Sequence, residues 1–121
     1  MSWPKAERKI LRSIRAGTDL NTPRTTYRTV IAVRNDISSI RYGYANEVGF
    51  QIQIGKTSSI SIPLRVLKSC YVAVGRKNGY DGDCFRQNFP LQASDHPCHV
   101  HVIGQIFVKS GLAKRFGNTY R

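Results

Sequence analysis

Acidic side chains are scarce in this sequence, which contains seven Asp and Glu residues against nineteen Lys and Arg residues. Its formal charge is therefore +12 at pH 7, and a surface of that sign attracts polyanions. The scarcity also removes the carboxylates on which calcium loops and many acid–base pairs depend. Asp81 and Asp83 lack the remaining ligands of a calcium loop, and Glu47 has no closely paired carboxylate. The composition favours a protein that is not an enzyme, needs no cofactor and has nucleic acid as its partner.

Cysteine is also rare, and the three cysteines form no CxxC pair. That absence argues against a disulfide framework and against a cysteine-rich zinc module. Cys98 does lie among three histidines, His96, His99 and His101, which are competent zinc ligands. Whether this segment is a helix or a strand, only some of the four side chains share a face, and no second cluster completes the set. We therefore expect no bound metal, and a metal-dependent hydrolase is the minor alternative.

Long apolar runs are missing as well. No run approaches the roughly 20 residues of a transmembrane helix, and charges are spread through the first seventeen residues instead of the apolar centre of a secretory signal. A chain of 121 residues with 40% hydrophobic residues is the size of one domain. We expect a single cytoplasmic domain over residues 1–121 with no membrane partner.

Hydrophobic spacing divides that domain into a helix, a sheet and a helical unit, which is an α+β fold. Residues 4–16 predict a basic helix, because Ala6, Ile10 and Ile14 fall on one face and Gly17 follows. Residues 26–62 predict a small antiparallel sheet of about four strands, in which the last two form a hairpin over 48–62. The four predicted strands span residues 26–34, 37–44, 48–54 and 59–62.

The helical unit, residues 63–121, contains predicted helices at 63–76, 82–89 and 96–110. The third carries conflicting signals, because the Val and Ile residues of 98–108 favour a strand by propensity. Asp95 as an N-cap, Pro97 in the first turn and Gly111 beyond the last turn favour a helix. We adopt the helix.

A helix at 96–110 places His101, Gln105 and Lys109 in one polar stripe, because they are spaced four residues apart. Imidazole, amide and amine groups can hydrogen-bond base edges and phosphates in a major groove. An ordinary solvated face is the alternative interpretation of the same stripe. The predicted helix 4–16 offers a second basic face through Arg8, Lys9 and Arg12, which is either a phosphate-contacting surface or a solvated one.

The order of the helices 63–76, 82–89 and 96–110, followed by "GLAKRFGNTYR", resembles the winged helix-turn-helix superfamily. The resemblance covers about half of the chain. It implies that the third helix, with His101, Gln105 and Lys109, enters the major groove. It also implies that Lys114 and Arg115 lie beside phosphates at the wing.

The leading hypothesis is therefore a nucleic-acid-binding protein that acts as a transcriptional regulator or accessory factor, with double-stranded DNA favoured over RNA. A domain that reads palindromic DNA is commonly dimeric, so a homodimer is possible. RNA stays open because Tyr42, Tyr44 and Phe50 on a sheet could stack bases. The second hypothesis is a protein-interaction or small-ligand-binding α+β domain whose charge serves solubility.

Overall fold

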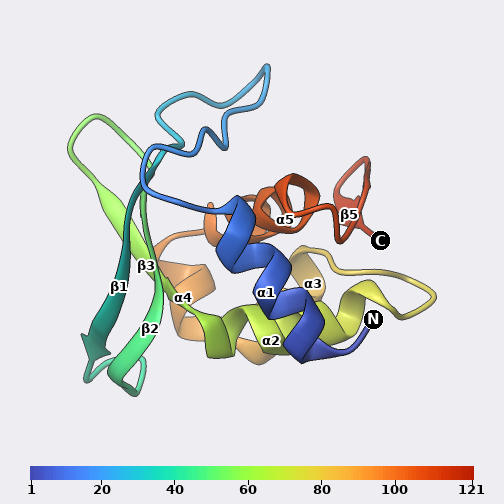
Figure 1. Ribbon diagram of the computed structural model, residues 1–121, viewed down its shortest axis with the longest axis horizontal. Coiled ribbons are helices and arrows are strands. Elements are labelled where there is room, and N and C mark those ends of the chain that lie inside the picture. Colours follow the sequence, from blue (N-terminus) through green and yellow to red (C-terminus); the bar gives the residue numbers. More distant parts are fainter.

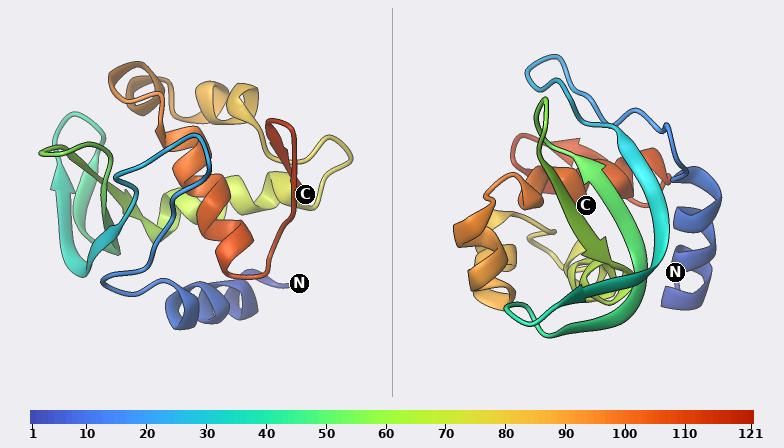
Figure 2. Two further views of the ribbon diagram at one scale, coloured as in Figure 1. Left: turned by 90° about the horizontal axis from the view of Figure 1, so that it is seen from above. Right: turned by 90° about the vertical axis from the view of Figure 1, so that its left-hand side faces the viewer.

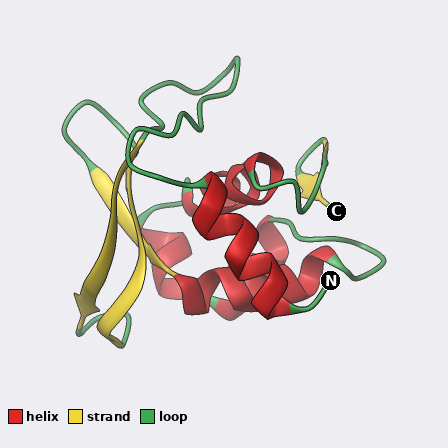
Figure 3. Ribbon diagram, in the orientation of Figure 1, coloured by secondary structure: helices red, strands yellow, loops and turns green.

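A three-stranded antiparallel sheet stands against a layer of helices in the computed structural model, which describes residues 1–121 (Figure 1). The sheet has the order β1 (Val30–Ser39), β2 (Tyr44–Gln53), β3 (Ser59–Pro63). All the helices lie on one side of it (Figure 3). The predicted α+β class is confirmed.

The helical layer contains α1 (Trp3–Ser13), α2 (Leu64–Val74), α3 (Gly82–Asn88), α4 (Pro90–Asp95) and α5 (His99–Lys109). A short hairpin of β4 (Arg115–Phe116) and β5 (Thr119–Tyr120) follows α5. None of these helices has both the length and the apolar composition needed to cross a membrane.

The sheet has three strands instead of the predicted four, because β1 does not stop at the polar pair Asn35–Asp36. The strand continues to Ser39 with a register irregularity between Arg34 and Ile37, which is how a bulged edge strand accommodates polar residues. The predicted strand 37–44 is therefore divided between the end of β1, a turn, and the first residue of β2. Residues 26–29, expected to begin the first strand, precede it.

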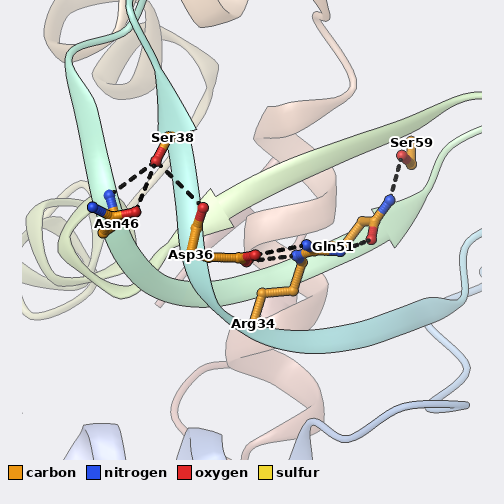
Figure 4. A network of polar contacts seen from close by, with 6 residues as sticks. All are labelled: Arg34, Asp36, Ser38, Asn46, Gln51 and Ser59. Carbon is orange, nitrogen blue, oxygen red and sulfur yellow. Dashed lines mark hydrogen bonds and ion pairs between the residues drawn. The ribbon is translucent and has the colours of Figure 1, made fainter.

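Polar side chains cover the outward face of the sheet near β1. Arg34 donates two hydrogen bonds to the Asp36 carboxylate, at 2.9 and 3.0 Å, and a longer one to Gln51 Oε1 at 3.3 Å (Figure 4). The Gln51 amide in turn donates to Ser59 Oγ at 3.1 Å. These contacts tie three strands together on the side away from the helices.

The inward face of the predicted hairpin is apolar, and the hairpin itself is confirmed. Phe50 pairs with Ile62 and Ile52 with Ile60 across β2 and β3, and all four side chains are buried. Hydrophobic alternation in both strands thus places one face on the helices. This face and the helices share one hydrophobic core.

Helix α5 is the centre of that core, and the helical interpretation of residues 98–108 is confirmed. It contacts α1, α2, α3, α4 and β5, and runs through the middle of the molecule in the left view of Figure 2. The buried residues of α5 are His99, Val100, Val102, Ile103, Gly104, Ile106 and Phe107. Packing on several sides outweighs the modest strand preference of the β-branched residues.

The end of α5 follows the prediction and its start does not. Gly111 has φ +73°, Leu112 N–H donates to the Phe107 carbonyl at 2.9 Å, and Gly111 N–H donates to the Val108 carbonyl at 3.0 Å. These are the two hydrogen bonds of a Schellman end. The N-cap is Cys98, however, because Asp95 is already the last residue of α4.

Helix α4 lies between the predicted helices 82–89 and 96–110, and its presence makes four helices between residues 64 and 109 instead of three. Pro90 occupies its first turn, where the missing N–H has no cost. The buried Gln92 donates to the Tyr44 hydroxyl at 2.9 Å, which ties α4 to the sheet. The winged-helix arrangement expected from the three predicted helices is not confirmed.

The C-terminal hairpin is attached to the body by Tyr120. Its backbone exchanges two hydrogen bonds of 2.8 Å with Tyr80, and its side chain is completely buried. The ring lies over Gly104 of α5, where a Cβ atom would come within 2.2 Å of it. The missing side chain at Gly104 therefore determines where the hairpin packs.

Candidate functional site

The polar stripe of α5 forms part of a surface pocket of about 590 Å³. Three segments build it: the loop between α1 and β1, helix α5, and the β4–β5 hairpin. The left view of Figure 2 shows the loop passing over α5 and the hairpin beside the same helix. The lining residues are Leu20, Thr22, Pro23, Arg24, Thr25, Arg28, Cys98, His101, Val102, Gln105, Arg115, Gly117 and Asn118.

The pocket is strongly basic, because Arg24, Arg28 and Arg115 line it and no Asp or Glu does. Carboxylates pair with arginine elsewhere on the molecule. The four ion pairs are Arg34–Asp36, Arg41–Asp95, Arg65–Glu47 and Arg86–Asp83. The three pocket guanidinium groups thus keep uncompensated charge, which concentrates positive potential in a concave site.

The loop that carries Arg24 and Arg28 is held by local hydrogen bonds. Arg28 N–H donates to Asn21 Oδ1 at 2.7 Å, and the Thr22 and Thr25 hydroxyls are 2.7 Å apart. Arg28 Nη1 also donates to the Ile54 carbonyl at 2.6 Å. The Arg28 guanidinium is therefore anchored to the end of the β2–β3 hairpin.

His101 is a neutral hydrogen-bonding group on the α5 side of the pocket. Its Nδ1 is 2.9 Å from the Tyr120 hydroxyl. Burial lowers the pKa of His101, and the nearby Arg115 charge lowers it further. Burial also raises the pKa of Tyr120, so the phenol keeps its proton at pH 7. The pair therefore offers fixed polar contacts without charge.

Arg115 is positioned by the hairpin. Its guanidinium carbon lies 5.5 Å from the centre of the Tyr120 ring, and its Nε donates to the Gly117 carbonyl at 2.8 Å. Cation–π contact with an aromatic ring leaves the outer N–H groups free for an anion. Arg115 thus combines a fixed position with unused donors.

Cys98 lines the pocket as a half-buried thiol. Burial raises its pKa, although the Arg28 charge opposes this shift. A thiol with a raised pKa is protonated at pH 7 and is a poor nucleophile. The pocket is therefore equipped for binding an anion more than for thiolate chemistry.

The residues predicted from the sequence fall into two groups. His101, Gln105 and Arg115 lie together in the pocket lining. Lys109 is exposed at the end of α5, and Lys114 is exposed next to the hairpin, but neither lines the pocket.

The basic residues of α1 form a separate surface. Arg8 and Arg12 are exposed and Lys9 is half-buried, and none of them lines the pocket. Any contact that they make with a nucleic acid would be additional to the pocket.

Sequence reasoning missed the loop side of the site. Arg24 precedes the predicted strand 26–34, and Arg28 lies near the start of that strand. Hydrophobic periodicity does not single out either arginine. The available signal was composition, because "TPRTTYR" combines two arginines with four hydroxyl side chains suited to anions. Asn118, which also lines the pocket, is not among the residues predicted from the sequence.

The histidines considered as metal ligands point to different surroundings. His99 is buried, stacks on Phe85 with ring centres 5.5 Å apart, and has Nδ1 2.8 Å from the His96 carbonyl. His101 lies instead against Tyr120. No group of three or more His, Cys, Asp or Glu residues is placed to hold a metal ion.

The aromatic residues considered for RNA stacking are largely inside the fold. Phe50 and Tyr44 are buried, and the half-buried Tyr42 donates its hydroxyl hydrogen to Asp95. The sheet therefore has no open aromatic platform of the kind that stacks bases.

Comparison of the chain with protein-family models, with curated proteins and with solved structures finds no match, so the functional argument rests on the geometry of this chain alone.

Proposed function

We propose that the protein binds nucleic acid, with double-stranded DNA as the preferred form, and acts as a transcriptional regulator or accessory factor. The observation that carries the proposal is the pocket in which Arg24, Arg28 and Arg115 occur without any acidic residue. Arginine is well suited to phosphate, since its planar donors match the oxygen atoms in pairs. His101 and Gln105 in the same lining supply neutral groups for base edges.

The winged-helix resemblance remains a hypothesis within this proposal. It would have α5 present His101, Gln105 and Lys109 to the bases while Lys114 and Arg115 contact phosphates. Support comes from the partial or full exposure of all five side chains. The basic face of α1 would extend the phosphate contacts through Arg8, Lys9 and Arg12. We also propose a cytoplasmic location and a homodimer. Sedimentation with and without a palindromic duplex tests the homodimer.

The charge on the pocket gives a quantitative test by salt titration. Each phosphate contact contributes about 0.9 to the slope of log affinity against log salt, so three pocket arginines account for about 2.7. Replacing Arg24, Arg28 and Arg115 by alanine should reduce the slope by about that amount. The measurement is fluorescence anisotropy of a labelled duplex between low and physiological salt.

A matched control removes the same charge elsewhere. Lys56, Arg76 and Lys77 are exposed, belong to no ion pair and lie outside the pocket. Their replacement by alanine should change the slope less. Equal effects of the two triple variants, or no duplex binding at low salt, would remove the proposal.

A small-ligand-binding protein is the second candidate, and the size of the pocket favours it. Cavities for small molecules measure about 300 to 1,000 Å³ and combine apolar walls with a few polar groups. Leu20 and Val102 supply apolar wall here, beside the arginines. A protein of this kind would bind a small anion at the same site and show no affinity for a duplex.

A further inference from the structure

We propose that the pocket receives a single unpaired nucleotide of the bound nucleic acid. This inference rests on the proposed function and names the part of the nucleic acid that the site takes. The arginines of the pocket would hold the phosphate of this nucleotide, and His101, Gln105 and Asn118 would meet its base.

The position of α5 is the first argument. The loop passes over this helix and the C-terminal hairpin lies beside it, and residues from all three segments line the pocket. Most of the remaining surface of α5 is buried in the core. His101 and Gln105 are therefore at the wall of a hollow and not on a ridge. A base that stays stacked inside a duplex does not reach such a position, whereas an unstacked base does, so the nucleotide pocket is an alternative to the groove insertion that the winged-helix resemblance implies.

The size and lining of the hollow are the second argument. A volume of about 590 Å³ lies in the range of pockets that hold small molecules, the size class of one nucleotide. Leu20, Pro23 and Val102 supply apolar wall for the face of a base. The amides of Gln105 and Asn118 provide donors and acceptors of the kind that bond the edge of a base.

The distribution of charge is the third argument. Arg28 is anchored to the Ile54 carbonyl and Arg115 to the Gly117 carbonyl, so two guanidinium groups have fixed places at the pocket. Arg24 is exposed on the loop, also lines the pocket and belongs to no ion pair. His101 itself is neutral and contacts Tyr120, against which Arg115 also lies. The pocket thus places arginines for a phosphate next to neutral groups for a base.

The test compares three DNA duplexes that share one sequence, in anisotropy titrations at a single salt concentration. The first is fully paired, the second has one extra unpaired nucleotide at its centre, and the third has an abasic residue at the same place. We expect the second to bind at least tenfold more tightly than the first. The third should lose most of that advantage, because it keeps the bend and the phosphate but has no base.

Protein variants test whether the pocket causes the tighter binding of the bulged duplex. Replacing Gln105 and Asn118 together by alanine should bring the ratio of bulged to paired affinity to within about twofold. The control replaces Asn35 and Gln87, which are exposed amides outside the pocket, and should keep the tenfold ratio. Thermal melting of both variants identifies any loss of folding.

The failures of the two proposals are distinguishable. Equal affinity for the paired and bulged duplexes overturns the nucleotide pocket and leaves duplex binding in place. Equal affinity for the bulged and abasic duplexes also overturns it, since bending alone then explains the preference. Absence of binding to all three duplexes at low salt overturns the proposed function together with this inference.

Discussion

The contact between Gly104 and Tyr120 predicts that a substitution favourable to a helix should destabilise this protein. Alanine in place of glycine inside a helix normally contributes about 0.5–1 kcal/mol of stability. At position 104 the new Cβ would lie 2.2 Å from two atoms of the Tyr120 ring. The ring is fully buried between α5 and Tyr80, so it has no free space to move into.

The expected size follows from these opposing terms. Overpacking of a well-filled core costs about 1–3 kcal/mol, which exceeds the gain in helix propensity. The Gly104→Ala variant should therefore be less stable by about 1–2 kcal/mol, equivalent to a melting temperature lower by roughly 3–10 °C for a chain of this size. On the proposed function, affinity for duplex DNA should fall as well, because the displaced Tyr120 no longer positions His101.

The sign of the effect should reverse when the ring is removed. The Tyr120→Ala variant creates space above α5 and should itself cost about 3–5 kcal/mol. In that background Gly104→Ala should regain its ordinary benefit of about 0.5–1 kcal/mol. Urea unfolding of the wild type, both single variants and the double variant measures the coupling. Stabilisation by Gly104→Ala in the wild type, or the same loss in both backgrounds, would refute the reasoning.

Three further predictions concern ionisable groups. Hydrogen bonds from Arg41 and Tyr42 lower the pKa of Asp95 to about 2. This contact therefore stabilises the folded state above the ordinary Asp pKa, and the stabilisation disappears as pH falls towards 2. The free energy of unfolding in urea should differ between wild type and Asp95→Asn at pH 6 and become equal near pH 2. Burial lowers the pKa of His99, so the unfolded chain binds the proton more readily than the folded one. The melting temperature of the wild type should therefore fall as pH falls from 7 to 5. The His99→Phe variant, which keeps an aromatic ring against Phe85, should show a smaller fall over the same interval. Burial raises the pKa of Cys98, so iodoacetamide should modify this thiol slowly at pH 7 and faster at pH 9. Because Cys98 lines the pocket, a saturating concentration of duplex should suppress the reaction. Unchanged labelling with the duplex bound would contradict the binding of nucleic acid at the pocket.

The sequence predicted the helices best where local chemistry determines them. Gly111 ends α5 as expected, because only a residue without Cβ adopts φ +73° at little cost. The start of the same helix was placed too early, since Asp95 has the side chain of an N-cap but its carboxylate binds Arg41 and Tyr42. That choice depends on the turn between β1 and β2 approaching α4 in space, which no local pattern contains.

The site was predicted in part for the same reason. Helical spacing places His101 and Gln105 on one face, because residues four apart share a face whatever surrounds the helix, and both line the pocket. The loop arginines join them only after the chain has turned back over α5 and Arg28 has reached Ile54. A contact between residues far apart in sequence has no periodicity, so its partners were recognisable only by their composition.

The edge of the sheet has a consequence for how two copies of this protein meet. An unpaired strand edge is a template on which another chain can add its own strand, and proteins commonly block such edges with charges and bulges. Strand β1 carries both devices, in the Arg34–Asp36 pair and the irregular register beyond Arg34. Strand-to-strand self-association along β1 is thereby discouraged, so the proposed homodimer is expected to use a different part of the surface.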